Sequence, residues 1–253
     1  MIEVRSLYKS FEDRDVLHDI NAQFTEGQTN LIIGQSGSGK TVLMKCIVGL
    51  LEPTKGQILY DGRDFVRMNK HERTALRREM GMIFQSAALF DSMSVLENVM
   101  FPLDMFSTMT LRERKERARQ CLDRVNLGDA EAKYPGELSG GMQKRVAIAR
   151  AIALNPKYLF CDEPNSGLDP KTSLVIDALI HDITVEYNMT TIMNTHDMNS
   201  VLGIGEHILY IHKGNVGWTG TKDEIMTSTN EKLNSFIFAS DVMRYAKETM
   251  NRA

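Results

Sequence analysis

Apolar and polar residues alternate over short stretches in the first part of the chain, which predicts β-strands joined by turns. The alternation is clearest at residues 2–4 and 20–24, and a turn at Glu26-Gly27 precedes the apolar stretch 29–33. We therefore expect antiparallel strands that lead into the segment after residue 33.

The rest of the chain changes between helical and strand patterns. Residues 86–153 are mainly helical, and Thr110 with Glu113 forms a capping box that predicts the start of a helix reaching Val125. Beyond them strands and helices alternate, which is typical of a parallel sheet. The predicted elements are strands at 57–60, 82–84, 158–161, 190–194 and 208–212, and helices at 42–47, 70–78, 143–153, 171–187, 198–202 and after Ser240.

Composition places the chain among ordinary globular proteins. It has 253 residues, of which 42% are hydrophobic and 25% charged, enough for one large core with a subdomain. The net charge of −3 supplies no general attraction for nucleic acid, so we predict no nucleic-acid partner. The basic residues from Arg112 to Arg119 are interleaved with glutamates beside an apolar stripe, which favours a solvated helix face.

Three features suggest where the protein works. Cys46, Cys121 and Cys161 are odd in number and far apart, so we expect reduced thiols in the core. Residues 1–4 show a strand pattern, so we expect no secretory signal. No segment has the roughly eighteen consecutive apolar residues that cross a bilayer. We expect a cytoplasmic protein that acts at a membrane only through other chains.

The most informative segment follows the apolar stretch 29–33 and precedes a predicted helix; it reads Gly34-Gln35-Ser36-Gly37-Ser38-Gly39-Lys40-Thr41. Its glycines let successive backbone N–H groups face one anion, and the helix adds its positive end. Lys40 is expected to neutralise nucleotide phosphates, and the Thr41 hydroxyl to hold Mg²⁺. A flexible glycine linker would lack the flanking strand and helix, so the segment predicts nucleotide binding.

Two adjacent carboxylates, Asp162 and Glu163, end the apolar strand 158–161. Side chains alternate along a strand, so we expect the two acids to face different ways. Asp162 can approach Mg²⁺ held by Thr41, and Glu163 can polarise a water in line with the γ-phosphate. The structural alternative is an acidic turn before Pro164.

A second candidate anion site lies at Ser139-Gly140-Gly141, which opens a strongly helical stretch. A serine followed by glycines at a helix N-terminus can present backbone N–H groups to an anion. The alternative is a plain helix cap.

Together these motifs resemble the ABC-type ATPases, the nucleotide-binding subunits of ATP-binding-cassette systems. The resemblance covers almost the whole chain and follows the family's order: Walker A at 34–41, Gln85, the signature at 138–142, Walker B up to Glu163, the D-loop at 166–169 and His196. It implies an α/β fold, a P-loop NTPase of the ABC type whose RecA-like core carries an antiparallel β subdomain and a helical subdomain at about 86–153. We expect one ATPase domain at 1–226 and a C-terminal extension at 227–253.

The resemblance also implies a mechanism in which two copies bind head to tail, with each ATP between the Walker A loop of one copy and the signature of the other. Glu163 would be the general base, His196 would hold the γ-phosphate and attacking water, and Gln85 would sense Mg²⁺ and the water. The implied ATP contacts are Phe11, Val16, Gly34, Ser36, Gly37, Ser38, Gly39, Lys40, Thr41 and Val42 within one copy, and Ser139, Gly140, Gly141, Met142 and Asp169 from the other. The implied Mg²⁺ ligands are Thr41, Gln85 and Asp162.

The chain departs from the common family pattern at two positions. Phe11 stands where the family usually has a tyrosine that stacks on adenine, which keeps the stacking and removes the hydroxyl. Tyr8 is a rival for that role. Met142 replaces the usual glutamine of the signature, which leaves the contacts of Ser139 and the backbone intact.

Within the family, residues 84–95 and Met142 look most like the ATPase of Mla-type lipid transporters, which work with MCE proteins. This implies phospholipid transport between inner and outer membranes, from the cytoplasmic face of the inner membrane. The implied partners are a second copy, a permease bound near residues 85–90, an MCE-domain protein and an accessory subunit. Residues 87–90 would line the permease groove or form subdomain core. In the tail, Phe236, Phe238 and Met243 are expected to contact a partner.

Other classes fit less well. A small-molecule or nucleoside kinase has a Walker A loop but no need of the signature or of His196. A DNA-repair ATPase separates Gln85 from the signature by a long coiled coil, whereas 54 positions separate Gln85 from Ser139 here. An ABC-type translation factor carries two cassettes in one chain. Another membrane-coupled cassette, such as an importer, a lipoprotein-release ATPase or a cell-division ATPase, stays open.

Overall fold

The structure is a computed structural model that describes residues 1–12 and 14–239. It divides into two compact units. Residues 1–68 and those from 192 onward form the first unit, and residues 69–191 form the second. The chain passes back to the first unit inside β8 (Thr190–Asn194).

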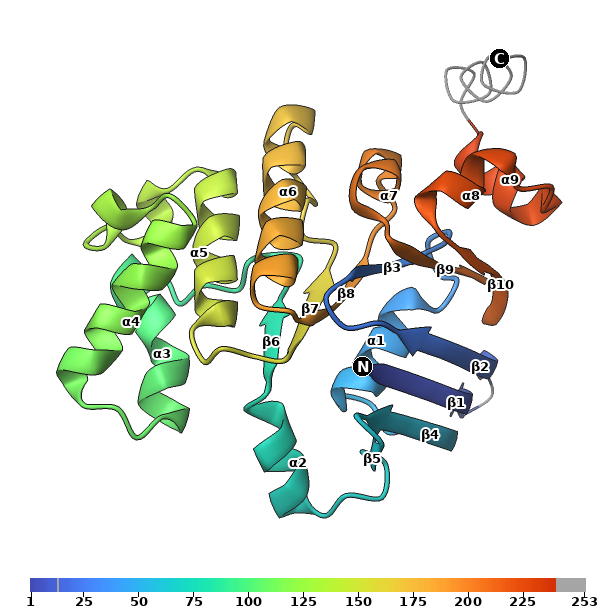
Figure 1. Cartoon of the computed structure of the whole chain (residues 1–253), viewed down its shortest axis with the longest axis horizontal. Helices are drawn as coiled ribbons and strands as arrows, with labels where there is room; N and C mark the ends of the chain where they lie inside the picture. Colours follow the sequence, from blue (N-terminus) through green and yellow to red (C-terminus); the bar gives the residue numbers. More distant parts are fainter. Residues whose placement is uncertain (13, 240–253) are drawn as a thin grey trace. The chain divides into compact units, whose positions relative to one another are not determined.

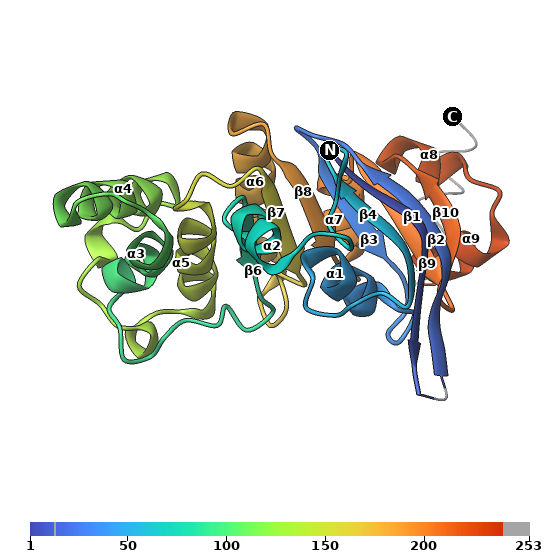
Figure 2. The same cartoon turned by 90° about the horizontal axis from the view of Figure 1, so that it is seen from below.

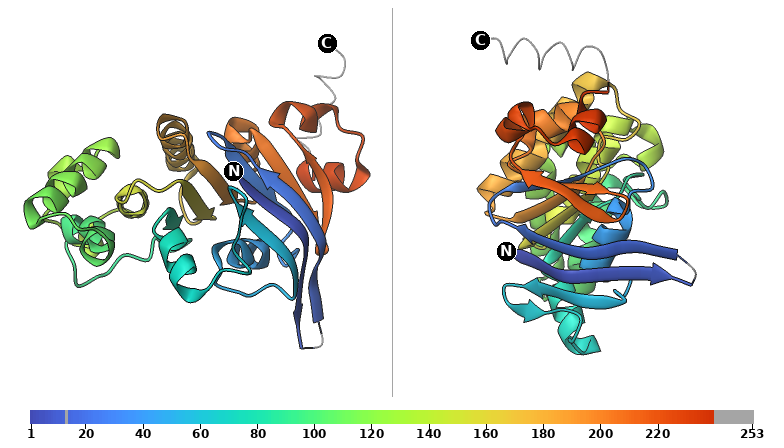
Figure 3. Two further views of the ribbon diagram at one scale, coloured as in Figure 1. Left: turned by 60° about the horizontal axis from the view of Figure 1, so that its bottom comes forward. Right: turned by 90° about the vertical axis from the view of Figure 1, so that its right-hand side faces the viewer.

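The first unit begins with the antiparallel strands that the sequence predicts. Their order across the sheet is β2-β1-β4-β5, and Figure 3 shows β1 and β2 as a long hairpin beside β4. Ile2 and Val4 of β1 are buried, because alternate side chains of a strand face the same side. Leu7 is buried as well, because an irregularity in the pairing with β2 between Val4 and Leu7 changes which side chains face inward. The bounds are β1 (Ile2–Phe11), β2 (Arg14–Phe24), β4 (Lys55–Tyr60) and β5 (Arg63–Asp64).

A second set of strands in this unit carries the phosphate-loop segment. The order is β10-β9-β3-β8, in which β3 (Thr29–Ile33) runs parallel to β9 (His207–His212), and β10 (Asn215–Gly220) pairs antiparallel with β9. All five residues of β3 are buried, as expected for a strand covered on both faces. The predicted strands 29–33, 190–194 and 208–212 are therefore confirmed.

The described residues of the first unit include the helices α1 (Lys40–Val48), α7 (Met198–Ile204), α8 (Lys222–Thr227) and α9 (Glu231–Ile237). Helix α9 lies beside β10 (Figure 1). Helices α8 and α9 have no counterpart among the elements predicted from the sequence, and the helix predicted after Ser240 lies outside the described residues. Phe238 is buried, so this ring packs inside its own chain instead of facing a partner. Phe236 is partly exposed and stacks on Tyr210 at 5.4 Å, and its contact with a partner stays a prediction. Met243 also lies outside the described residues.

The second unit contains parallel strands and most of the helices that the structure describes in residues 1–239. Strands β6 (Met80–Ile83) and β7 (Tyr158–Asp162) are parallel, and α3, α4 and α5 lie together (Figure 2). The helices are α2 (Lys70–Arg77), α3 (Val95–Phe106), α4 (Leu111–Arg124), α5 (Gly140–Ile152) and α6 (Pro170–Glu186), with short 3₁₀ turns η1 (Gly128–Ala130) and η2 (Pro135–Glu137). The predicted capping box at Thr110 and Glu113 is present. Helix α5 begins at Gly140 because Ser139 caps it, as the Ser139-Gly140-Gly141 segment predicts.

Cys46, Cys121 and Cys161 are buried and unpaired with one another, as predicted. Among residues 1–12 and 14–239, none of the helices combines the length and the apolar character that crossing a membrane requires.

Candidate functional site

The segment 34–41 forms a tight loop between β3 and α1 in the first unit. Gly34, Gly37 and Gly39 have φ values of +152°, +75° and +110°, which side chains disfavour. A Cβ on Gly34 would lie 2.3 Å from the carbonyl oxygen of Ile211, so this position has room only for glycine. Gly39 is the N-cap of α1, and the loop therefore ends at the positive end of a helix.

Lys40 points into this loop instead of into solvent. Its side chain is 6% exposed, and Nζ donates hydrogen bonds to the carbonyl of Gly34 at 2.8 Å and to that of Gln35 at 3.3 Å. These bonds hold the ammonium group at the loop itself. Thr41 and Val42 follow in the first turn of α1, where Thr41 is exposed.

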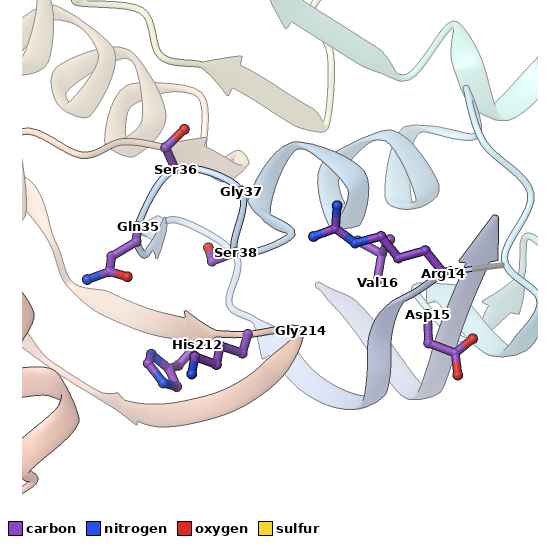
Figure 4. Close-up of a pocket in the computed structure, with 10 residues that line it drawn as sticks. Arg14, Asp15, Val16, Gln35, Ser36, Gly37, Ser38, His212 and Gly214 are labelled. Carbon is purple, nitrogen blue, oxygen red and sulfur yellow. The ribbon is translucent and has the colours of Figure 1, made fainter.

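The loop forms one wall of a pocket of about 280 Å³ (Figure 4). Its lining residues are Arg14, Asp15, Val16, Gln35, Ser36, Gly37, Ser38, His212, Lys213 and Gly214. Four predicted ATP contacts thus meet here, from the start of β2 and the phosphate loop. Oγ of Ser38 is buried and has no hydrogen-bond partner among the described residues, so a phosphate oxygen could satisfy it.

The two candidate aromatic residues differ in their position relative to this pocket. Phe11 is 40% exposed at the end of β1 and pairs with Arg14, which lines the pocket. Nζ of Lys9 lies 4.6 Å from the centre of the Phe11 ring. Tyr8 pairs instead with Lys55 of β4. The register therefore favours Phe11 over Tyr8 as the ring beside a bound base.

His196 follows β8 in the first unit and is exposed. The preceding residue, Thr195, donates its backbone N–H to the carbonyl of Ile32 at 3.2 Å. Ile32 belongs to β3, the strand that leads into the phosphate loop. The hydrogen bond of Thr195 therefore places the backbone of His196 next to β3, the strand that leads into the phosphate loop.

Gln85 follows β6 in the second unit and is held at its side chain and its backbone. Nε2 donates a hydrogen bond to Oγ of Ser166 at 3.1 Å, and the Gln85 carbonyl accepts one from Nζ of Lys144. Lys144 is 5% exposed, and this burial lowers its pKa. These two contacts fix Gln85 against the turn after β7 and against α5.

Asp162 is the last residue of β7, and Glu163 follows it with a φ of +49°. The expectation that the two carboxylates face different ways relied on strand alternation, which does not extend to Glu163 because the strand has ended. Both side chains are partly exposed. The backbone N–H of Ser166 donates to the Glu163 carbonyl at 3.1 Å and closes the turn.

The D-loop continues to Asp169, which caps α6. Its carboxylate accepts the backbone N–H of Thr172 at 3.0 Å and the Thr172 hydroxyl, and these bonds lower the pKa of Asp169. The carboxylate therefore stays ionised at the positive end of the helix.

Ser139 caps α5, since its Oγ accepts the backbone N–H of Met142 at 3.3 Å. Ser139 and Gly140 are exposed. A Cβ on Gly141 would lie 2.7 Å from Cγ2 of Thr172, which shows that the signature lies beside the start of α6. The helix cap considered in the sequence analysis is therefore formed, and it leaves the N-terminus of a thirteen-residue helix open to solvent.

The predicted site residues fall into two groups. Phe11, Val16, residues 34–42 and His196 belong to the first unit, and Gln85, residues 139–142, Asp162, Glu163 and Asp169 belong to the second. Each unit therefore carries one of the two helix N-termini at which the sequence predicts anion binding.

Sequence reasoning missed two features of these groups. Lys144 is one of several cations in its helix, and only the folded chain shows that its ammonium group is buried on the Gln85 carbonyl. The Lys213-Gly214 dipeptide between two strand patterns signals a turn, but nothing along the chain indicates that the turn borders the phosphate loop.

The residues proposed to hold Mg²⁺ suit that ion chemically. No group of three or more His, Cys, Asp or Glu side chains able to hold a metal exists within the described part of the chain. Mg²⁺, however, commonly binds through one or two carboxylates together with substrate phosphates. Thr41 and Asp162 offer oxygens of the required type, and Gln85 keeps its amide oxygen because Nε2 is used by Ser166.

Comparison with known proteins gives a consistent picture. The family description "ABC transporter" matches residues 17–166. The chain is 35% identical over 236 residues to the probable ribonucleotide transport ATP-binding protein mkl of Mycobacterium leprae, covering 93% of this chain and 68% of that protein. It is also 38% identical over 237 residues to the intermembrane phospholipid transport system ATP-binding protein MlaF of Haemophilus influenzae. That match covers 94% of this chain and 90% of MlaF.

A methionine import ATP-binding protein, MetN of Symbiobacterium thermophilum, is 38% identical over 244 residues, covering 95% of this chain and 73% of that protein. Among solved structures, a dimeric ATP-binding cassette in a post-hydrolysis state with ADP and Pi has a TM-score of 0.79 and 34% identity, covering 88% of this chain and 99% of that one. This chain therefore has the fold of an ABC cassette. With the phosphate loop, the signature helix cap and the family match in agreement, this chain belongs to the ABC transporter family and is a P-loop, ABC-type ATPase.

Proposed function

We propose that two copies of this chain form the ATP-hydrolysing part of a membrane transporter that moves phospholipids between the inner and outer membranes. The observation that carries the dimeric ATPase is the presence in one chain of two helix N-termini that offer backbone N–H groups to an anion, at the phosphate loop before α1 and at the exposed Ser139 cap of α5. A head-to-tail dimer uses both on the same nucleotide. The similar solved cassette is a dimer with ADP and Pi bound.

In this function the phosphate loop and Lys40 hold the β- and γ-phosphates, while Phe11 stacks on the base and Val16 contacts the nucleotide beside it. Thr41, Gln85 and Asp162 hold Mg²⁺, which neutralises phosphate charge when bound. Glu163 takes the proton of the attacking water.

His196 holds the γ-phosphate and the attacking water. From the other copy, Ser139 and the residues up to Met142 donate hydrogen bonds to the γ-phosphate. Asp169 of that copy also contacts the ATP. Charge-assisted hydrogen bonds of this kind exist only in the closed dimer, so ATP favours closure and hydrolysis favours opening.

The permease contact is supported by an apolar groove of about 510 Å³ in the second unit. It is lined by Met80, Gly81, Met82, Phe84, Ala88, Phe90, Phe101, Pro102, Phe106, Arg150, Ala151 and Leu154. Of the four residues 87–90 expected there, Ala88 and Phe90 line the groove, whereas Ala87 is buried core. We propose that an amphipathic helix of the permease occupies this groove.

Hydrogen bonds and ring packing brace the wall of this groove. The Arg150 guanidinium donates to the carbonyls of Ala87 and Ala88, both at 2.8 Å, and so fixes two residues whose φ values are +62° and +49°. The rings of Phe90 and Phe101 pack at 4.7 Å beside them. A preformed groove loses little entropy when a helix docks.

The choice of phospholipid as cargo rests on residues 84–95, on Met142 and on the MlaF relative, of which this chain covers 90%. An MCE-domain protein and an accessory subunit complete the proposed complex. This proposal puts the chain at the cytoplasmic face of the inner membrane.

The test is purification of the chain with a permease and MCE protein encoded beside it, followed by ATP-dependent transfer of labelled phospholipid between donor vesicles and acceptor particles. Phe106→Asp should abolish co-purification while preserving the ATPase activity of the isolated chain, because Phe106 lines the groove and is 44% exposed. Leu111→Asp, 54% exposed and outside the groove lining, is the matched control. Normal assembly of the Phe106 variant would contradict the contact.

A second candidate is the import of a small polar solute, which the methionine and ribonucleotide relatives favour at similar identity. In that case the co-purifying permease would stimulate ATP hydrolysis in response to the solute and would transfer no lipid.

A further inference from the structure

The β9–β10 hairpin contacts the phosphate loop near both ends of the loop, through Ile211 of β9 and through Gly214 of the turn. Gly34 packs so closely on Ile211 of β9 that a Cβ would lie 2.3 Å from the Ile211 carbonyl oxygen. Towards the other end, the backbone N–H of Gly214 donates to the carbonyl of Ser38 at 3.0 Å. The turn and the loop form facing walls of one pocket (Figure 4).

Gly214 also joins the turn to β2. Its carbonyl accepts the backbone N–H of His18 at 2.8 Å, and its φ is +75°. A Cβ at this position would lie 2.2 Å from the carbonyl oxygen of Val16, a backbone atom that has little freedom to move. Any side chain here would therefore push the turn away from β2, the phosphate loop, or both.

The same hairpin is supported from behind by α9. The Tyr210 hydroxyl donates to the carbonyl of Lys232 at 3.2 Å and lies 3.2 Å from Nδ1 of His212, a residue that lines the pocket. The Tyr210 ring stacks on Phe236, and Nδ2 of Asn230 donates to the carbonyl of Gly217 at 3.0 Å. A continuous set of contacts thus runs from α9 through the hairpin to the phosphate loop.

We propose that the β9–β10 hairpin, braced by α9, is a positioning element for phosphate binding, in which Gly214 fixes the backbone of the phosphate loop. Neither Gly214 nor Tyr210 is a catalytic residue; both act through the loop. Donors aimed at a phosphate are effective only when they are held in place before the ligand arrives. The inference rests on the proposal that the phosphate loop binds ATP.

The test compares Gly214→Ala with Gly62→Ala in the full-length protein. Both glycines have similar φ values, +75° and +80°, but a Cβ on Gly62 meets no atom within 4 Å. Gly62→Ala therefore introduces a similar backbone strain at a positive φ, but its added Cβ displaces no neighbouring atoms. We expect Gly214→Ala to raise KM for ATP and the Kd for a fluorescent ATP analogue about tenfold, with a smaller change in kcat. Gly62→Ala should leave KM within about twofold of the unsubstituted chain.

A KM for Gly214→Ala equal to that of the control would overturn the proposal. If Gly214→Ala does not fold, Tyr210→Phe decides instead, because it removes the hydroxyl bonds to Lys232 and His212 and keeps the ring on Phe236. It should raise KM about two- to fivefold, and an unchanged KM would overturn the role of α9 and the hairpin.

Lys40→Ala separates this inference from the proposed function. Loss of binding in Lys40→Ala together with normal binding in Gly214→Ala and Tyr210→Phe would refute the positioning role alone. Normal ATP binding in Lys40→Ala would refute the nucleotide site itself.

Discussion

Nε2 of Gln85 donates a hydrogen bond to the hydroxyl of Ser166 at 3.1 Å, which ties the residue after β6 to the turn after β7. The bond uses the nitrogen of the amide and leaves its oxygen for a cation. We predict that Ser166→Ala shifts the Mg²⁺ concentration for half-maximal ATP hydrolysis upward about two- to tenfold, as loss of one hydrogen bond would produce. Ser92→Ala, an exposed serine elsewhere in the same unit, is the control. If the Mg²⁺ concentration for half-maximal hydrolysis does not change in Ser166→Ala, the proposal that Gln85 binds Mg²⁺ is contradicted.

Lys40→Ala should remove the main cation of the phosphate loop. Losing one strong electrostatic contact to a transferring phosphoryl group costs roughly 3–4 kcal/mol in the transition state, or about 10²–10³ in rate. Phosphate release and fluorescent-nucleotide binding measure the two effects. Lys45→Ala is the matched control, because Lys45 is exposed in the last turn of the same helix. Equal losses in both variants would show that the effect is one of net charge.

Glu163→Gln should keep ATP binding and lose hydrolysis, because an amide cannot accept the proton of the attacking water. The variant should accumulate as a dimer in Mg²⁺-ATP, which size-exclusion chromatography with light scattering detects. Glu116→Gln on the exposed face of α4 should behave like the unsubstituted chain. Hydrolysis by Glu163→Gln at the native rate would remove Glu163 from the role of general base.

We predict that the free energy of unfolding falls at high pH because three cysteine thiols are buried. Burial raises the pKa of Cys46 and of Cys121 from 9.0 to about 11, and that of Cys161 further. The folded chain therefore holds these protons where the unfolded chain releases them. This contribution to the free energy of unfolding is complete below about pH 9 and declines as pH rises from about 9 towards 11.

Urea midpoints measured from pH 7.5 to pH 10.5 test this decline, and Cys121→Ala should reduce it. At pH 8 the folded protein should react slowly with a disulfide reagent, while the urea-unfolded protein should react at all three cysteines. Rapid labelling of the folded protein would show that the thiols are accessible.

Local sequence signals predicted much of this fold. The strand 29–33 and the glycine-rich turn after it depend on residues that are neighbours in the chain, and so does the capping box of Thr110 and Glu113. Such features are determined by backbone preferences and short-range hydrogen bonds.

Features that depend on distant contacts were not predictable in this way. Helices α8 and α9 are short, and α9 gains its stability by packing on β10. The burial of Lys144 and the bond from Gly214 to Ser38 join residues more than fifty positions apart. Sequence periodicity contains no information on such pairs, and only the family resemblance assigned Gln85 and His196 their roles.

The central claim is that each ATP site combines the phosphate loop of one copy with Ser139 of the other, and mixing two inactive variants tests it most directly. Lys40→Ala lacks a working loop, and Ser139→Arg blocks the signature helix end. In a mixed dimer one site combines both defects and the other is intact. The account predicts that an equimolar mixture recovers up to about a quarter of native ATP hydrolysis, because half of randomly formed dimers are mixed and each has one intact site. A mixture no more active than the two variants measured separately would contradict the shared site.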